Sequence, residues 1–140
     1  MSILEYFNRS PFRELVGIEV TEAADGHAEG HLELAEEHSS TRADLVAQGG
    51  VTYTLADSVG GAAAVSLYEV PTPTVDFRID YLRPATDDLH ATGDVRRDGD
   101  ETATVDVAVH DATGARVADG RGVYQTSGLP DDAPWSLDHE

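Results

Sequence analysis

The sequence predicts an α+β domain in which a curved antiparallel sheet wraps around one long helix. Strand-like segments lie on both sides of a long segment of small and apolar residues, whose length is typical of a helix. A helix of roughly 18 residues is about 27 Å long, comparable to a strand of about eight residues. A sheet wrapped around the helix is therefore the economical way to bury both.

The first third of the chain predicts one or two short helices and then a hairpin. Residues 3–15 have a helical pattern, which Pro11 interrupts. Residues 16–21 and 27–34 alternate between apolar and polar side chains, as strands do, and the Asp-Gly pair at 25–26 is a turn signal. A polar loop is expected to follow them.

The central helix is predicted from about Gly50 to Tyr68, where two following prolines stop it. Its small residues would let the sheet approach the helix backbone closely. We interpret the Gly60-Gly61 pair as a packing feature, because its spacing fits no phosphate-binding loop or dinucleotide fingerprint.

Four strand-like segments follow the helix. In the first of them four apolar residues alternate with charged ones and predict a core face: Val75, Phe77, Ile79 and Tyr81. Residues 89–97 and 101–110 flank an Asp-Gly-Asp hairpin signal, and residues 115–126 form the last segment. Hairpin connections predict that the four strands form an antiparallel meander.

The 140 residues predict a single domain over residues 1–126, with residues 1–15 as an N-terminal helical segment. Residues 127–140 are acidic and contain two prolines, which predicts a flexible C-terminal tail. We expect Trp135 to pin part of this tail.

The charge predicts a protein adapted to a highly saline cytoplasm. The chain carries 27 acidic and nine basic residues, a net charge of −18, and all nine basic residues are arginine. Self-repulsion would strain the compact state in dilute buffer, whereas at molar salt the screening length falls to about 3 Å. Nucleic acid is a poor partner for such a surface.

Composition and motifs exclude several other classes. The chain has no cysteine, so neither disulfides nor a thiol nucleophile can contribute. No segment approaches the roughly 18 apolar residues of a membrane span, and no signal peptide is evident, so we expect a cytoplasmic protein without a membrane partner. The six histidines follow no metal-site pattern, and we expect no metal.

The candidate catalytic residues lie in the first half of the central helix. Gly49 and Gly50 stand where free backbone N–H groups and the helix dipole can stabilise an oxyanion. Asp57 lies seven residues after Gly50, two turns on and on the same face, and Thr54 shares that side. Asp57 could act as a general base for water or as a nucleophile, or it could be a buried structural carboxylate.

The motif Gly-Gly-x-x-x-Thr-Leu-Ala-Asp at 49–57 resembles the hotdog-fold thioesterases of the phenylacetate-pathway (PaaI-like) type. Residues 74–85 and 118–122 resemble further strands of that family. The resemblance implies a hotdog fold and hydrolysis of acyl-CoA thioesters without metal or organic cofactor. It also implies homodimers that join sheets edge to edge and commonly pair into homotetramers, with the active sites at the dimer interface.

The same resemblance implies the roles of individual residues. Asp57 matches the family's catalytic carboxylate, supplied by one subunit together with a hydroxyl residue from the other. Gly49 matches the glycine whose backbone N–H polarises the thioester carbonyl, and Thr74 the hydroxyl residue that positions water. Gln48 replaces the family's usual histidine; it can donate a hydrogen bond but cannot carry a proton.

Gly50 and Thr54 are predicted to contact substrate, and Arg83 and Arg97 to hold the phosphates of coenzyme A. The predicted function is an acyl-CoA thioesterase for a small aryl or a short-to-medium acyl group. Two alternatives remain: a hotdog hydratase, which would need an aspartate–histidine dyad, and a non-catalytic module that binds or senses acyl-CoA.

Overall fold

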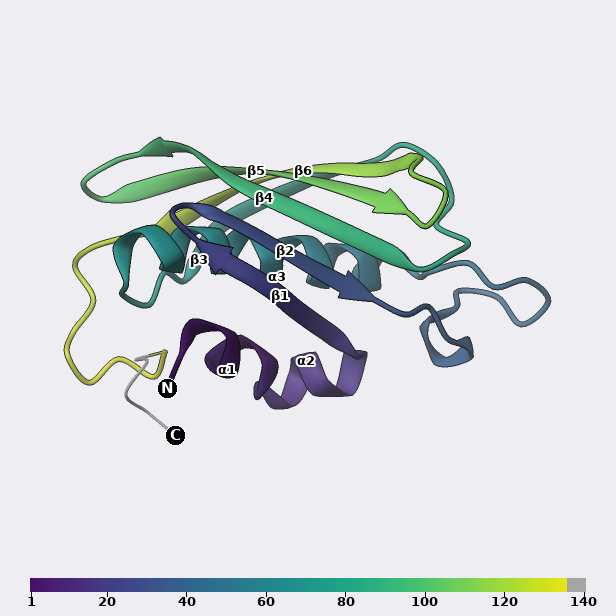
Figure 1. Cartoon of the computed structure of the whole chain (residues 1–140), viewed down its shortest axis with the longest axis horizontal. Coiled ribbons are helices and arrows are strands. Elements are labelled where there is room, and N and C mark those ends of the chain that lie inside the picture. Colours follow the sequence, from purple (N-terminus) through teal and green to yellow (C-terminus); the bar gives the residue numbers. More distant parts are fainter. Residues whose placement is uncertain (136–140) are drawn as a thin grey trace.

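The computed structural model describes residues 1–135. Its elements are α1 (Ile3–Asn8), α2 (Pro11–Val16), β1 (Ile18–Ala24), β2 (His27–Leu32), the 3-10 helix η1 (Glu36–His38), α3 (Gly49–Tyr68), β3 (Thr74–Tyr81), β4 (Leu89–Asp98), β5 (Thr102–Asp111) and β6 (Arg116–Gln125). The strands form one antiparallel sheet in the order β1-β2-β4-β5-β6-β3, which curves over α3 (Figure 1). The predicted α+β architecture is confirmed.

Helix α3 is enclosed because its side chains are small. Most of its residues between Thr52 and Val65 are buried. Val59 packs between two strand glycines, Gly30 of β2 and Gly93 of β4, and a Cβ on Gly30 would lie only 2.6 Å from Val59 Cγ2. The absence of side chains at these two strand positions therefore sets how closely the sheet approaches the helix.

Gly60 of α3 lies against the ring of Tyr124, which reaches the helix from β6. A Cβ on Gly60 would overlap the Tyr124 phenol oxygen and lie 3.3 Å from Val107 Cγ2. At Gly61 the nearest side-chain atoms are 3.6 Å away, an ordinary van der Waals contact. The interpretation of this glycine pair as a packing feature is confirmed for Gly60.

The prediction of a four-strand meander is wrong. Strands β4, β5 and β6 pair in sequence order, but β3 pairs with β6 instead of β4. The connection over residues 82–88 is too long for a tight hairpin, and the Leu82 N–H donates to Val117 O of β6 at 2.9 Å. Strand β4 pairs with β2 instead, which leaves β1 and β3 at the two edges of the sheet.

The predicted core face of β3 is only partly buried, because β3 is an edge strand. Phe77 is buried, but Val75 and Tyr81 are 60% and 52% exposed. Leu82, directly after the strand, is also exposed. Strand β3 therefore presents an apolar edge with one unpaired side, which is a template for pairing with another strand.

Residues 127–135 run back from β6 towards α1 (Figure 1). The Tyr6 hydroxyl donates to the main-chain oxygen of Trp135 at 3.0 Å, and Ala133 is buried. The Trp135 backbone thus ties this segment to α1, while the indole is half exposed. Residues 136–140 of the predicted flexible tail lie outside the described residues.

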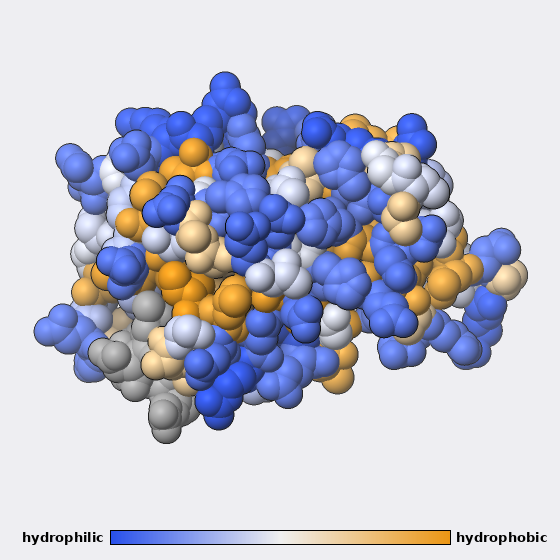
Figure 2. All heavy atoms as spheres, viewed as in Figure 1, coloured by the Kyte–Doolittle hydropathy of each residue, from blue (hydrophilic) through white to orange (hydrophobic). Residues whose placement is uncertain are grey.

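The surface is dominated by polar side chains, and one face shows hydrophilic residues with apolar patches between them (Figure 2). No helix in residues 1–135 combines the length and the apolar character needed to cross a bilayer.

We expect Gly60→Ala and Gly61→Ala to have opposite effects on the free energy of unfolding. The added methyl at Gly60 overpacks the contact with Tyr124 and should destabilise the protein by about 1–3 kcal/mol. At Gly61 there is room, so the gain in helix propensity should leave stability unchanged or raise it by up to about 1 kcal/mol. Denaturant unfolding at molar salt measures both, and a stable Gly60→Ala variant would contradict the packing account.

Candidate active site

The Asp57 side chain is held by two hydroxyl groups from different strands. The Thr74 hydroxyl, at the start of β3, donates to Asp57 Oδ1 at 2.9 Å. The Tyr124 phenol, from β6, donates to the same Oδ1 at 3.0 Å and lies 3.1 Å from the Asp57 main-chain oxygen. No described residue donates a hydrogen bond to Asp57 Oδ2, which leaves that oxygen available to a bound molecule.

Asp57 opens into a pocket of about 340 Å³ between α3, the N-terminal helices and the segment that precedes β3. Much of its wall is aromatic or apolar: Tyr6, Phe7, Gly61, Val65, Pro71, Pro73, Tyr124 and Trp135. Thr72 also lines it, and the Thr72 hydroxyl is buried without a hydrogen-bond partner among the described residues. The pocket therefore combines an apolar wall with a few polar groups, as small-molecule sites do.

A cation stands in the same pocket. The Arg13 guanidinium lies over the Phe7 ring at 4.6 Å and donates from Nε to Ser58 Oγ at 2.9 Å. Burial lowers the pKa of Arg13, and the nearby Asp57 carboxylate opposes that shift. Because arginine stays protonated in proteins, Arg13 gives this pocket a permanent positive charge close to Asp57.

The Gln48 side chain caps α3, because its Oε1 accepts a hydrogen bond from the Gly50 N–H at 2.5 Å. The Gly50 N–H, expected to contact substrate, is therefore already occupied. Donation by the Gln48 amide Nε2 to a thioester stays a prediction. The Gly49 N–H has no hydrogen-bond partner among the described residues, so it remains the free donor at this helix end.

Gly49 lines a second pocket, of about 380 Å³, together with Thr52, Tyr81, Leu82 and Arg83. The Tyr81 hydroxyl donates to the Gly49 main-chain oxygen at 2.7 Å and fixes the end of β3 against the start of the helix. Gly49 thus lines a hollow of its own, beside the apolar end of β3.

A single chain does not bring Asp57 and the Gly49 N–H together. They are eight residues apart on one helix, which separates them by about 12 Å along its axis. They also line different pockets. Convergence of Asp57 and the Gly49 N–H on one thioester therefore stays a prediction, which the groups of one chain by themselves do not meet.

The remaining predicted site residues are dispersed. Thr54 lines neither pocket; its hydroxyl donates back to the Gly50 main-chain oxygen at 2.7 Å. Arg83 lines the Gly49 pocket. Arg97 lies near the end of β4, beside the β4–β5 hairpin. That hairpin lies at the other end of α3, because the Tyr68 hydroxyl donates to Gly99 O. Arg83 and Arg97 therefore do not form one phosphate site within a chain.

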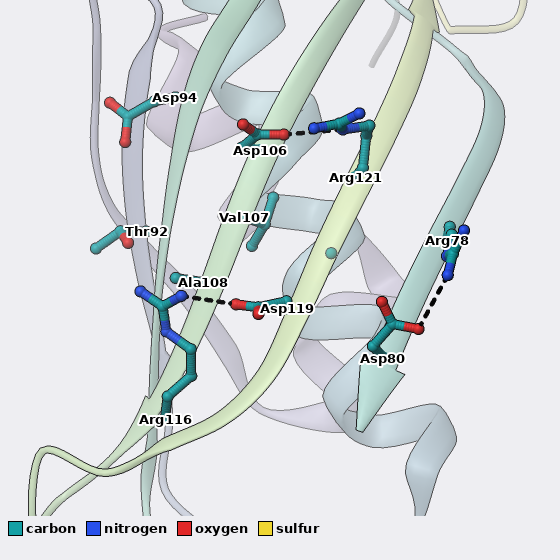
Figure 3. Close-up of a pocket in the computed structure, with 11 residues that line it drawn as sticks. Arg78, Asp80, Thr92, Asp94, Asp106, Val107, Ala108, Arg116, Asp119 and Arg121 are labelled. Carbon is teal, nitrogen blue, oxygen red and sulfur yellow. Dashed lines mark hydrogen bonds and ion pairs between the residues drawn. The ribbon is translucent and has the colours of Figure 1, made fainter. Parts of the chain in front are cut away.

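A larger hollow, of about 610 Å³, lies on the outer face of the sheet, on the side away from α3 (Figure 3). Its three arginines are ion-paired with aspartates: Arg78 with Asp80, Arg116 with Asp119, and Arg121 with Asp106. These exposed pairs neutralise one another, so this hollow lacks the unpaired groups of a reactive site.

Residues 46–118, just over half of the chain, match the thioesterase superfamily. The chain belongs to this superfamily. A Halobacterium salinarum protein named "Putative esterase VNG_1336C" is 30% identical over 136 residues, covering 88% of this chain and 89% of that protein. The crystal structure of another thioesterase superfamily protein aligns with a TM-score of 0.83 and 35% identity, over 89% of this chain and 96% of the other.

The hotdog fold is confirmed by this membership and by the arrangement of the sheet around α3. Escherichia coli PaaI aligns with a TM-score of 0.77 and 23% identity, over 91% of this chain and 97% of its own. A Streptococcus pneumoniae hypothetical thioesterase, solved with coenzyme A, aligns with a TM-score of 0.78 and 22% identity, over 90% and 98%. At these identities the likeness concerns the fold alone.

Two residues of this thioesterase superfamily member were missed by sequence reasoning. Tyr124 reaches Asp57 from a strand more than sixty positions later, and Arg13 enters the pocket from an N-terminal helix. Neither belongs to the motif around Asp57. The sequence signal for Tyr124 was a large ring matched to glycines at positions 60 and 122. This match can be recognised only when the positions of the strands are known.

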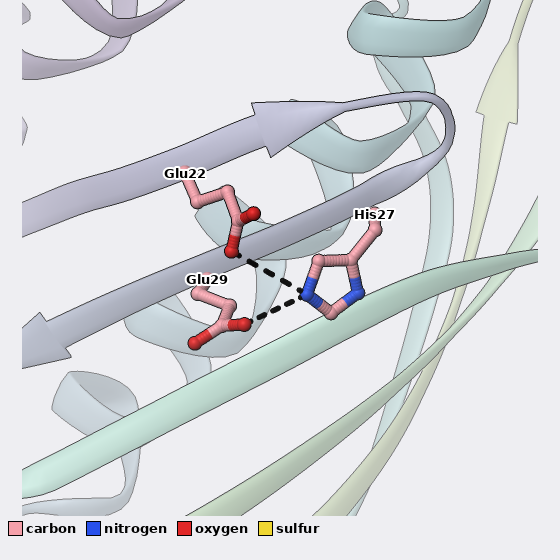
Figure 4. Close-up of side chains that lie close together, drawn as sticks. All are labelled: Glu22, His27 and Glu29. Atoms are coloured by element: carbon pink, nitrogen blue, oxygen red, sulfur yellow. Dashed lines mark hydrogen bonds and ion pairs between the residues drawn. The ribbon is translucent and has the colours of Figure 1, made fainter.

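A cluster of ionisable side chains lies on the β1–β2 hairpin (Figure 4). His27 contacts Glu29 at 2.8 Å, Asp94 at 2.6 Å and Glu22 at 3.8 Å. The hydrogen bond to Glu29 and then that to Asp94 raise the pKa of His27 to about 8. Glu22, His27 and Glu29 could offer ligand atoms to a cation, but both ring nitrogens of His27 are already hydrogen-bonded to the carboxylates of Glu29 and Asp94.

We expect His27 to titrate near pH 8 in the folded protein, against its ordinary value of 6.5. Because the folded state raises the pKa, the stabilising effect is complete below about pH 6.5 and is lost as the pH rises past about 8. NMR titration of the His27 ring measures this directly. Replacing His27 with Gln should flatten the stability profile between these pH values; a midpoint at or below 6.5 would contradict the geometry.

Proposed function

We propose that this protein is an acyl-CoA thioesterase in which Asp57 acts on the thioester. The supporting observation is the Asp57 carboxylate itself, which accepts hydrogen bonds at Oδ1 from Thr74 and Tyr124 and belongs to a residue that lines a largely apolar pocket. A carboxylate held in this way is typical of a catalytic base or nucleophile. The Streptococcus pneumoniae neighbour was solved with coenzyme A, which is consistent with a coenzyme A thioester as substrate.

The Asp57 carboxylate can cleave the thioester by either of two routes. As a base it takes a proton from water, whose oxygen bonds to the carbonyl carbon while the electrons of the carbonyl move onto oxygen. As a nucleophile it bonds to that carbon and forms a mixed anhydride, which water then hydrolyses. In both routes the carbon–sulfur bond breaks and the coenzyme A thiolate leaves, to be protonated by solvent.

The negative charge that develops on the carbonyl oxygen needs a donor, and the free Gly49 N–H is suited to this role. The Asp57 of the same chain is about 12 Å away along the helix, so we propose that the Gly49 N–H comes from a second copy. A homodimer, which could pair again into a homotetramer, would complete the site.

Strand β3 provides a geometric route to that dimer. Its first residue, Thr74, lies at the Asp57 pocket, and its last, Tyr81, lies at the Gly49 pocket. If two β3 edges pair antiparallel about a two-fold axis, the start of one strand lies opposite the end of the other. Asp57 of each copy then approaches Gly49 of its partner, and two equivalent composite sites result.

The pocket supports an acyl group of limited size. A volume of about 340 Å³ with an aromatic wall suits a small aryl or a short-to-medium acyl chain, as the PaaI-like resemblance implies. A hydratase is less well supported, since no histidine of residues 1–135 lines the Asp57 pocket. The non-catalytic binding module is the second candidate, because Gln48 caps the helix in place of a proton carrier.

The charge supports function at high salt, and the Halobacterium salinarum relative is consistent with this. Activity assays are therefore best run at molar salt, where the repulsion expected from a net charge of −18 is screened.

Thiol release from a panel of acyl-CoA thioesters tests the proposal. We expect Asp57→Asn to lower kcat by about 10²–10⁴-fold with little change in KM, because the isosteric amide cannot accept the proton or attack the carbonyl. Circular dichroism and thermal unfolding of both proteins check that the variant is folded. Tight acyl-CoA binding without turnover by the wild type would favour the binding module instead.

Arg83 is our candidate for the phosphates of coenzyme A, because it lines the Gly49 pocket and is exposed. Arg83→Ala should raise KM about 10-fold and change kcat less, since a charge-assisted hydrogen bond contributes about 1.5 kcal/mol. Arg116→Ala, which removes one charge from the outer face of the sheet, is the matched control. An unchanged KM in Arg83→Ala would reject the role.

A further inference from the structure

We propose that Tyr124 is a positioning residue that, together with Thr74, immobilises Asp57 Oδ1 and so assigns the chemical step to Oδ2. This inference rests on the proposed function of Asp57. It adds a residue outside the sequence motif and identifies which of the two carboxylate oxygens reacts.

Both hydroxyl donors reach the same oxygen. Thr74 approaches Oδ1 at 2.9 Å from the start of β3, and Tyr124 approaches it at 3.0 Å from β6. The two strands are neighbours, and Thr74 pairs directly with Tyr124 in the sheet register. The donors therefore keep a fixed spacing, and a carboxylate that accepts from both can turn only by breaking both bonds.

The Tyr124 ring has almost no freedom to move. The residue is 1% exposed, and a Cβ on Gly60 of α3 or on Gly122 of β6 would overlap its ring or hydroxyl. Because both positions are glycine, there is space for the Tyr124 ring, and its hydroxyl lies within hydrogen-bond distance of Asp57. Burial and the nearby Asp57 charge raise the pKa of Tyr124 well above its ordinary value, so the phenol keeps its proton, which it donates to Asp57 at Oδ1 or at the main-chain oxygen.

Fixing Oδ1 has a direct chemical consequence. Oδ2 is the oxygen to which no described residue donates a hydrogen bond, so it takes the water proton or forms the bond to the carbonyl carbon. In the first case one O–H bond of water breaks, the proton goes to Oδ2 and the hydroxide oxygen bonds to the carbon. Without the donors the carboxylate could rotate, and a misplacement of about 1 Å at a reacting group costs on the order of 10²-fold in rate.

The competing explanation is that Tyr124 only fills the core between α3 and β6. Under that explanation Tyr124→Phe would leave kcat unchanged, because the ring contacts would remain. The hydroxyl group is therefore the feature to test.

We expect Tyr124→Phe to lower kcat by about 10-fold to 100-fold with KM within about twofold of the wild type. Apart from Tyr124, the ionisable groups that face Asp57 are Arg13 from α2 and Tyr53 from α3, and both are left in place. Tyr68→Phe is the control, since the Tyr68 hydroxyl donates to Gly99 O and does not contact Asp57.

The outcomes separate this inference from the function it rests on. If Asp57→Asn retains full activity, the proposed function fails. If Asp57→Asn is inactive but Tyr124→Phe matches Tyr68→Phe in kcat and KM, Tyr124 is only a core residue and the inference is overturned. Should Tyr124→Phe not fold, a fluorotyrosine at 124 keeps the ring and hydroxyl and alters the donor strength; a kcat unchanged across the fluorotyrosine series would equally overturn it.

Discussion

The structure depends on how closely the sheet can approach the central helix. That approach is set by missing side chains: Gly30 and Gly93 accommodate Val59 on one side, and Gly60 accommodates Tyr124 on the other. The same closeness brings a strand tyrosine within hydrogen-bond distance of Asp57. The packing of the core and the hydrogen bond to Asp57 therefore depend on the same close approach of sheet and helix, and a larger residue at one of these glycines would disturb both.

The elements of the fold and its three hairpin pairings, β1–β2, β4–β5 and β5–β6, were predictable from the sequence, but the pairings of β3 with β6 and of β2 with β4 were not. Periodicity and turn residues identified the helices and strands, and the prolines marked the end of the long helix. The position of β3 was not readable, because alternation gives a strand its faces and says nothing of its neighbours. Val75 and Tyr81 satisfy the pattern of a core face, yet they are exposed because β3 has a partner on one side only.

The candidate site was predictable only where its residues lie in the segments that carry the family resemblance, which include Thr74 as well as the start of α3. Asp57 and the glycines at the start of α3 form one contiguous motif, whereas Tyr124 and Arg13 reach the pocket from distant segments. The capping role of Gln48 was also not predicted, because it depends on the side-chain rotamer that brings Oε1 to the Gly50 N–H. The seven-residue spacing predicts Asp57 and Gly50 on one face of the helix, but the rise per residue keeps Asp57 far from the Gly49 N–H.

Because the two pockets lie at opposite ends of β3, the activity of the proposed two-chain site would depend on protein concentration and on salt. A catalytic centre assembled from two chains exists only in the associated fraction of molecules, so specific activity would fall on dilution even while every chain stays folded. Association must also overcome the mutual repulsion of two polyanions, each with a net charge of −18. When the salt concentration falls, the subunits would then dissociate and the activity would be lost, although the individual subunits still keep their structure.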